Sequence, residues 1–151
     1  MYRHILIPTD GSPLSINAAR EGFELARALA ARVTGFFAGP EFPGLYLGDG
    51  VLVTPSAIDE HRRAVTDLGQ KNLAVLEAMA GDCGVQFAGK QVQSDLPWSA
   101  IVQAAEEEGC DLIVMGSHGR GALGGLVVGS QTTKVLSHSK VPVLVVRGTP
   151  A

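Results

Sequence analysis

The sequence predicts an α/β protein in which five parallel strands form a three-layer, doubly wound sheet. Short apolar runs alternate with segments of helical periodicity along the 151 residues. That alternation is typical of a parallel sheet whose right-handed crossovers place helices on both faces. Apolar residues make up 46% of the chain and charged residues 18%. This globular composition indicates a single domain over residues 1–151 with one sizeable core.

The first predicted strand is the apolar run 4–8, which ends at a proline. In the turn cluster that follows, Ser12 and Pro13 have the order of an N-cap and a first helical residue. From 15 to 31, apolar residues recur at helical spacing with charged residues between them, which indicates an amphipathic helix. A second strand is expected at 32–39.

The segment from Pro40 to Pro55 is rich in glycine and proline and is too long to be a simple connection. It is either a lid or partner-contact segment, or it packs over the edge of its own sheet, and the sequence leaves both open. Ser56 is expected to cap a long helix that ends near Cys83.

The remaining elements continue the alternation of strand and helix. The third strand has only partial alternation of apolar residues, which suggests a sheet edge, and Ser130 is expected as the N-cap of the last helix. The third strand, a helix, the fourth strand, the last helix and the fifth strand are expected at 85–92, 95–108, 111–115, 131–138 and 141–147.

A glycine-dense stretch at 116–130 joins the fourth strand to the last helix. Glycines let a backbone approach a ligand closely, and unpaired N–H groups at a helix N-terminus attract anions. Ligands of such sheets bind at the carboxyl ends of the strands, where the strand order reverses. If the first and fourth strands are neighbours, segment 8–12 lies beside the glycine stretch, and together they predict a nucleotide site.

The glycine pattern differs from the common phosphate-binding motifs. A formal G-x-G-x-x-G occurs at 119–124, but it follows the fourth strand and lacks an acidic residue about 20 positions later. A G-x-x-x-x-G-K-[ST] loop is absent from the sequence. The pattern that remains is G-x2-G-x9-G-S, formed by Gly116, Gly119, Gly129 and Ser130.

Composition excludes several other classes of function. The net charge of −3 and the 5% aromatic content argue against nucleic acid as a partner. Apolar runs stay well short of the roughly 20 residues that span a bilayer, so no membrane partner is expected. Cys83 and Cys110 are far apart and are interpreted as buried, reduced thiols, which indicates a cytoplasmic protein.

These motifs resemble the universal stress protein family, in particular its ATP-binding branch. The resemblance rests on Ile-Leu-Ile-Pro-Thr-Asp-Gly-Ser at 5–12, on segment 111–119, on the G-x2-G-x9-G-S loop and on the final strand. It covers nearly the whole chain. It implies the adenine nucleotide alpha hydrolase-like fold with strand order 3-2-1-4-5. It also implies a homodimer through the edge strand from Val141 to Val146 and a role in the stress response.

The resemblance implies ATP as the ligand, with Mg²⁺ carried on its phosphates. The adenosine is expected beside Pro8, Thr9 and Asp10, with Asp10 facing a ribose hydroxyl or the Mg²⁺, and the backbone of Ala38 is expected to read the adenine edge. The residues expected to contact the ribose and phosphates are Gly116, Ser117, His118, Gly119, Arg120, Gly121, Gly129, Ser130, Gln131 and Thr132.

Three functions remain open on this sequence. The first is an ATP-binding regulatory module, and the second is a slow ATPase or nucleotide-dependent transferase that uses the same site. For the second, Asp10, His118 and Arg120 are candidates, but none has a catalytic partner visible in the sequence, and Arg120 is either a phosphate ligand or solvated. A flavin carrier is the third, and the few aromatic residues argue against it. We therefore assign no catalytic residue and no metal ligand.

Overall fold

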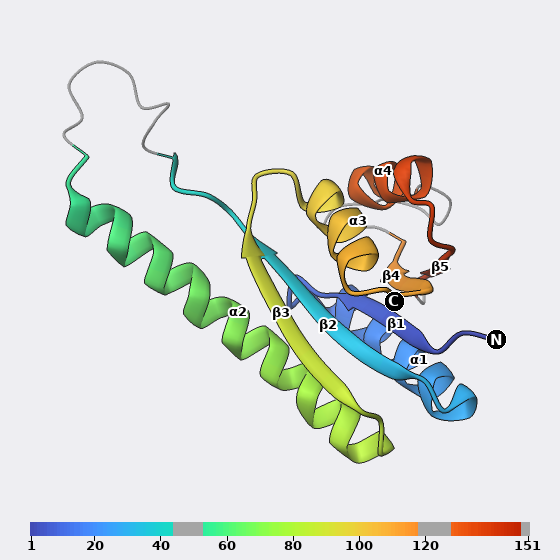
Figure 1. The fold of residues 1–151 in the computed structure, drawn as a ribbon. Coiled ribbons are helices and arrows are strands. Elements are labelled where there is room, and N and C mark those ends of the chain that lie inside the picture. The colour runs from blue at the N-terminus through green and yellow to red at the C-terminus, as the bar shows by residue number, and fades with distance from the viewer. Residues whose placement is uncertain (44–52, 118–127, 149–151) are drawn as a thin grey trace.

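The computed structural model describes residues 1–43, 53–117 and 128–148 (Figure 1). Its five parallel strands lie in the order β3-β2-β1-β4-β5, which confirms the predicted fold. The strands are β1 (His4–Pro8), β2 (Arg32–Gly39), β3 (Phe87–Gln93), β4 (Leu112–Gly116) and β5 (Val143–Val146). The helices are α1 (Pro13–Leu29), α2 (Pro55–Cys83), α3 (Pro97–Glu107) and α4 (Ser130–His138).

The central strand β1 divides the core into two layers because its side chains alternate between the two faces of the sheet. Ile5 and Ile7 belong to a cluster with residues of α1 and α2, whereas Leu6 belongs to a cluster with residues of α3 and α4. All three side chains are fully buried. Figure 1 shows the corresponding arrangement, with α1 and α2 on one face and α3 and α4 on the other.

The strand order reverses direction at β1, which is the feature that positions the site. From β1 the chain first builds β2 and β3 on one side, and then crosses back to build β4 and β5 on the other. Helices leaving the carboxyl ends of β1 and β4 therefore diverge to opposite faces and leave a crevice between them. β3 and β5 are the two edges of the sheet, as the sequence predicted.

Helix starts follow the capping pattern of the sequence, with two corrections. Ser12 caps α1 as expected, and its Oγ accepts the Ser15 N–H at 3.2 Å. The expected cap of α2 at Ser56 is wrong, because Thr54 is the N-cap and its Oγ1 accepts from Ala57 at 3.2 Å.

The second correction concerns α4. Its N-cap is Gly129, and Ser130 is the first helical residue rather than the cap. A glycine cap has no side chain that could bond the amides of the first turn. This difference matters for the site described below.

The opposite, amino-terminal end of the sheet is held by Asp111, which directly precedes β4. Its carboxylate accepts the N–H groups of Arg3 and His4 at 2.9–3.1 Å. Partial burial opposes ionisation, but these two backbone hydrogen bonds outweigh it and lower the pKa of Asp111. The His4 ring is buried beside Thr34, with 2.8 Å between Nε2 and Oγ1.

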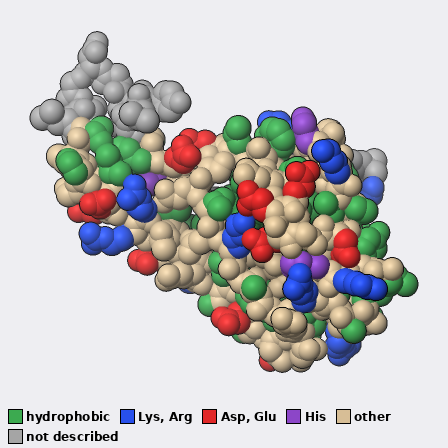
Figure 2. All heavy atoms as spheres, in the orientation of Figure 1, with side chains coloured by type: hydrophobic (Ala, Val, Ile, Leu, Met, Phe, Trp, Pro, Cys, Tyr) green, Lys and Arg blue, Asp and Glu red, His purple; other side chains and the backbone are tan. Residues whose placement is uncertain are grey.

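Acidic and basic side chains are interspersed over the face seen in Figure 2. This face therefore lacks the field of one sign that attracts a polyanion. No helix in the described ranges is both long enough and apolar enough to cross a membrane. Both cysteines are unpaired, and Cys110 is buried as expected, whereas Cys83 is only half-buried.

Candidate nucleotide site

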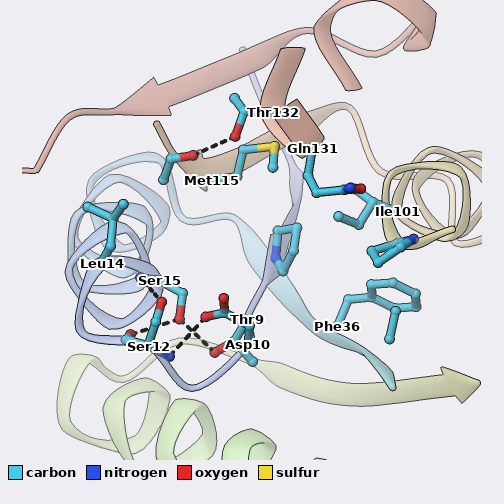
Figure 3. Close-up of a pocket in the computed structure, with 14 residues that line it drawn as sticks. Thr9, Asp10, Ser12, Leu14, Ser15, Phe36, Ile101, Met115, Gln131 and Thr132 are labelled. Atoms are coloured by element: carbon cyan, nitrogen blue, oxygen red, sulfur yellow. Dashed lines mark hydrogen bonds between the residues drawn. The ribbon is translucent and has the colours of Figure 1, made fainter. Parts of the chain in front are cut away.

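A cavity of about 230 Å³ opens at the carboxyl ends of β1, β2 and β4 (Figure 3). Hydroxyl and carboxylate groups of the β1–α1 turn lie on one side of it, and the side chains of Phe36 and Ile101 lie on the other. The residues that line it are Pro8, Thr9, Asp10, Ser12, Leu14, Ser15, Phe36, Ala38, Pro97, Ile101, Met115, Gly116, Gln131 and Thr132.

The polar side of the cavity is a compact turn between β1 and α1. The Thr9 N–H donates to the Phe36 carbonyl at 2.8 Å, which extends the β1–β2 pairing by one bond. The Thr9 hydroxyl then accepts the Gly11 N–H at 3.1 Å, and Asp10 Oδ1 accepts the Ser12 N–H at 2.9 Å. Gly11 has a φ of +78°, a conformation that favours glycine. These bonds fix the Asp10 side chain at the mouth of the cavity.

Asp10 is ionised in this turn. Partial burial works against the charge, but hydrogen bonds from Ser12 and Ser15 outweigh burial and lower the pKa of the carboxyl group. An ionised carboxylate only accepts hydrogen bonds, so it suits a ribose hydroxyl or a hydrated cation rather than a bare phosphate oxygen.

The second wall is formed where β4 ends and α4 begins. Ser117 follows β4 and is buried, and its carbonyl accepts the Gly129 N–H across the intervening chain. The Thr132 hydroxyl, in the first turn of α4, donates to the Gly116 carbonyl at 2.8 Å. These two bonds hold the N-terminus of α4 against the end of β4.

The first turn of α4 borders the cavity through Gln131 and Thr132. Gln131 lines the cavity, and its Oε1 accepts the Trp98 N–H of α3 at 3.0 Å. Gly129, the N-cap of α4, has no side chain. The N–H groups in the first turn of α4 therefore have no side-chain oxygen at the N-cap to accept their hydrogen bonds. This positive helix end, beside a largely apolar cavity, is chemically suited to an anionic ligand with an apolar moiety.

A sequence model of the universal stress protein family matches residues 1–147. The chain belongs to the universal stress protein family. It is 37% identical over 147 residues to a universal stress protein of Thermus aquaticus, covering 97% of this chain and 100% of that protein. It is 31% identical over 150 residues to universal stress protein MJ0531 of Methanocaldococcus jannaschii, covering 97% and 83%.

Solved structures of the family share the fold. Protein MJ0577, also of M. jannaschii, superposes with a TM-score of 0.83 and 28% identity over 100% of this chain and 99% of that one. A universal stress protein solved in complex with cAMP has a TM-score of 0.65 and 24% identity over 97% of each chain. An Arabidopsis thaliana family member with AMP bound has a TM-score of 0.64 and 13% identity, covering 97% and 92%.

The universal stress protein fold brings together many of the residues that the sequence suggested for the site. The lining residues among them are Pro8, Thr9, Asp10, Ala38, Gly116, Gln131 and Thr132. Ser117, Gly129 and Ser130 adjoin the cavity along the chain but do not line it. His118, Gly119, Arg120 and Gly121 lie outside the described residues.

Sequence reasoning missed the apolar wall. Phe36 could have been found, because it lies two residues before Ala38 on the same strand and therefore on the same face of the sheet. Pro97 and Ile101 carry no such signal, since they reach the cavity only through the packing of α3. Within the described ranges, no group of three or more His, Cys, Asp or Glu is arranged to hold a metal ion.

Proposed function

We propose that this universal stress protein binds ATP in the cavity at the carboxyl ends of β1 and β4, and that nucleotide occupancy regulates its activity as a stress-response module. The observation that carries the proposal is the juxtaposition of an apolar pocket, an ionised carboxylate and the uncapped N-terminus of α4. Each of these three features suits one part of a nucleotide.

The apolar wall suits the adenine base. Phe36 and Ile101 are buried and face the cavity from β2 and α3, while Ala38 leaves space at the end of β2. Binding sites for flat organic groups combine such walls with a few fixed polar groups. The backbone of Ala38 is the proposed reader of the adenine edge.

The N-terminus of α4 suits the phosphates. First-turn N–H groups and the positive end of the helix dipole stabilise an anion, and Ser130 adds a hydroxyl donor. Asp10 lies on the other side of the cavity, where it suits a ribose hydroxyl or the Mg²⁺ that ATP carries. Relatives of the same fold support an adenine nucleotide as the ligand, because two of them were solved with cAMP and with AMP.

The first test is to denature the purified protein and identify the released small molecules by chromatography and mass. We expect ATP in stoichiometric amount. Added ATP is then titrated into nucleotide-free protein by calorimetry. A protein that releases no adenine nucleotide and binds none of ATP, ADP or AMP would refute the proposal.

A charge placed at the helix end tests the phosphate site directly. Ser130→Glu puts an anion in the first turn of α4, which stabilises the helix but repels phosphate. We expect unchanged or slightly higher thermal stability and at least tenfold weaker ATP binding. Ser56→Glu is the matched control, because Ser56 is also an exposed first-turn serine, in α2, and does not line the cavity.

Dimerisation through β5 is the second part of the proposal. β5 is an edge strand, and Leu144 on it is 42% exposed. An open apolar edge favours pairing with a second copy. Light scattering at micromolar concentration should give the mass of a dimer. Leu144→Glu should give monomers, whereas Val75→Glu, at a similarly exposed residue of α2, should leave the dimer intact.

ATP hydrolysis is the competing function, favoured by one observation, the ionised Asp10 at the mouth of the cavity. Turnover requires a base or a cation positioned at the γ-phosphate. We expect phosphate release at background level. Release well above background that disappears in Asp10→Ala would replace the binding function with an ATPase.

A further inference from the structure

Helix α2 contains one polar residue in its buried stripe. Five of its positions are buried at a spacing of three or four residues, namely Val65, Gly69, Asn72, Leu76 and Ala80. Asn72 is only 9% exposed. Burying an amide costs free energy unless its hydrogen-bonding groups are paired. An apolar residue of similar size would fill this position without that cost.

The Asn72 amide packs against the turn that carries Asp10. A Cβ built on Gly11 would lie 2.6 Å from Asn72 Oδ1 and 3.0 Å from Nδ2, so the amide contacts the Gly11 backbone directly. Asn72 Nδ2 is buried and, within the described residues, has no hydrogen-bond partner. It is therefore an unused donor facing a turn in which the Thr9 hydroxyl and the Asp10 carboxylate already accept the N–H groups of Gly11 and Ser12.

We propose that Asn72 is a positioning residue of the nucleotide site, which packs against the Thr9–Ser12 turn and donates a hydrogen bond from Nδ2 to a backbone carbonyl of that turn when ATP is bound. This inference rests on the proposed function. Asn72 does not line the cavity, so it acts through the turn rather than on the ligand. A donor that is paired only in the bound state favours that state by the free energy of the bond.

If Asn72 has this role, replacing it by an apolar residue should weaken ATP binding without lowering the stability of the ligand-free protein. Asn72→Leu replaces the amide by an apolar group of similar size, which removes a buried unpaired donor. Thermal stability of the ligand-free variant should equal or exceed that of the wild type. The Kd for ATP should rise about fivefold, the effect of one hydrogen bond lost from the bound state.

Leu76→Ala is the matched control on the same helix. Leu76 is fully buried one turn further along the stripe and packs toward β2 at Gly35, away from the turn. This variant should lower thermal stability strongly while the Kd for ATP stays within twofold. If Asn72→Leu does not fold, Asn72→Ala takes its place, with Leu76→Ala as the reference for an equal loss of stability.

Calorimetric titration of ATP and amide hydrogen exchange together test the proposed role of Asn72. In the presence of saturating ATP, the Gly11 and Ser12 amides should exchange faster in Asn72→Leu than in the wild type, because the bound-state turn lacks the hydrogen bond from Asn72. A Kd equal to that of the wild type, or unchanged exchange at both amides, would overturn the role of Asn72. Wild-type protein that binds no ATP would instead refute the proposed function, and the role of Asn72 in a nucleotide site with it.

Discussion

The hydroxyl of Thr132 donates to the carbonyl of Gly116 across 2.8 Å, joining the first turn of α4 to the last residue of β4. Thr132 is 3% exposed, so water does not compete for this bond. The bond joins two residues that are 16 positions apart in the sequence. Together with the bond from the Gly129 N–H to the Ser117 carbonyl, this side-chain hydroxyl sets the position of the α4 N-terminus relative to the strand end.

Thr132→Val should lower the free energy of unfolding by about 1 kcal/mol, because it leaves the half-buried Gly116 carbonyl without this donor. It should also weaken ATP binding through a displaced helix end. Thr132→Ser keeps the hydroxyl and should retain most of the affinity. Urea unfolding and ATP titration of both variants measure these effects. Equal affinity in the valine and serine variants would contradict the prediction.

Stability should depend on pH through His4. Burial, assisted by Arg32, lowers the pKa of His4 below its ordinary value of 6.5, while Asp111 and Glu108 act in the opposite direction. The unfolded chain therefore binds a proton near pH 6.5 that the folded chain does not bind until lower pH. It follows that the free energy of unfolding falls as the pH drops below about 6.5, down to the folded pKa.

Urea unfolding between pH 5 and 7.5 measures this slope. His4→Gln keeps a hydrogen-bonding group near Thr34 but does not titrate, so it should flatten the dependence. His138→Gln is the matched control, since His138 is exposed at the end of α4 and its replacement should leave the slope in place. A slope that persists in His4→Gln would assign the effect to another group.

The two cysteines should differ sharply in reactivity. Burial, assisted by Glu108 and Asp111, raises the pKa of Cys110 to about 11, so its thiolate is scarce at pH 8. Cys83 is half-buried at the end of α2. A thiol reagent should modify one cysteine per native chain and both after denaturation. Cys83→Ser should leave the native protein unreactive, and rapid native modification of that variant would contradict the assignment.

Gly11→Ala should destabilise the protein by about 1–3 kcal/mol, because a side chain at φ +78° is strained and the new Cβ meets Asn72. Adding Asn72→Ala should recover the steric part of this loss but not the backbone part. Gly81→Ala is the control: Gly81 lies in α2 with nothing within 4 Å of its Cβ position, and alanine there should stabilise the helix. Thermal unfolding of these three variants beside the wild type measures the difference.

Most of the fold could be predicted because its signals are local. Strand β1 alternates between two clusters, and the turn after it contains Ser12 followed by Pro13, an unambiguous helix start. Thr54 followed by Pro55 has the same form, so the true start of α2 was also present in the sequence. The start of α4 was harder to place, because a glycine at the N-cap leaves no side-chain signal and the adjacent serine is the stronger candidate.

The candidate site could likewise be predicted only where its residues give a local signal in the sequence. Thr9, Asp10 and Gly116 could be predicted because they lie at or just after the carboxyl ends of two strands, and those ends must meet at one edge of the sheet. Ile101 and Asn72 could not, because their helical patterns show that they face inward but not which loop they contact. That contact depends on how α3 and α2 cross the sheet, which is a property of the assembled layers.

The hydrogen bonds of Asp111 join residues 108 positions apart, and β1 pairs directly with β4. A nascent chain emerging from the ribosome therefore carries one half of the cavity long before the other half has been synthesised. Until β4 arrives, one side of the central strand is an open apolar edge. Such long-range closure is slow compared with local folding. The ligand cannot assist the early steps of folding, and its contribution begins only when the last third of the chain is in place.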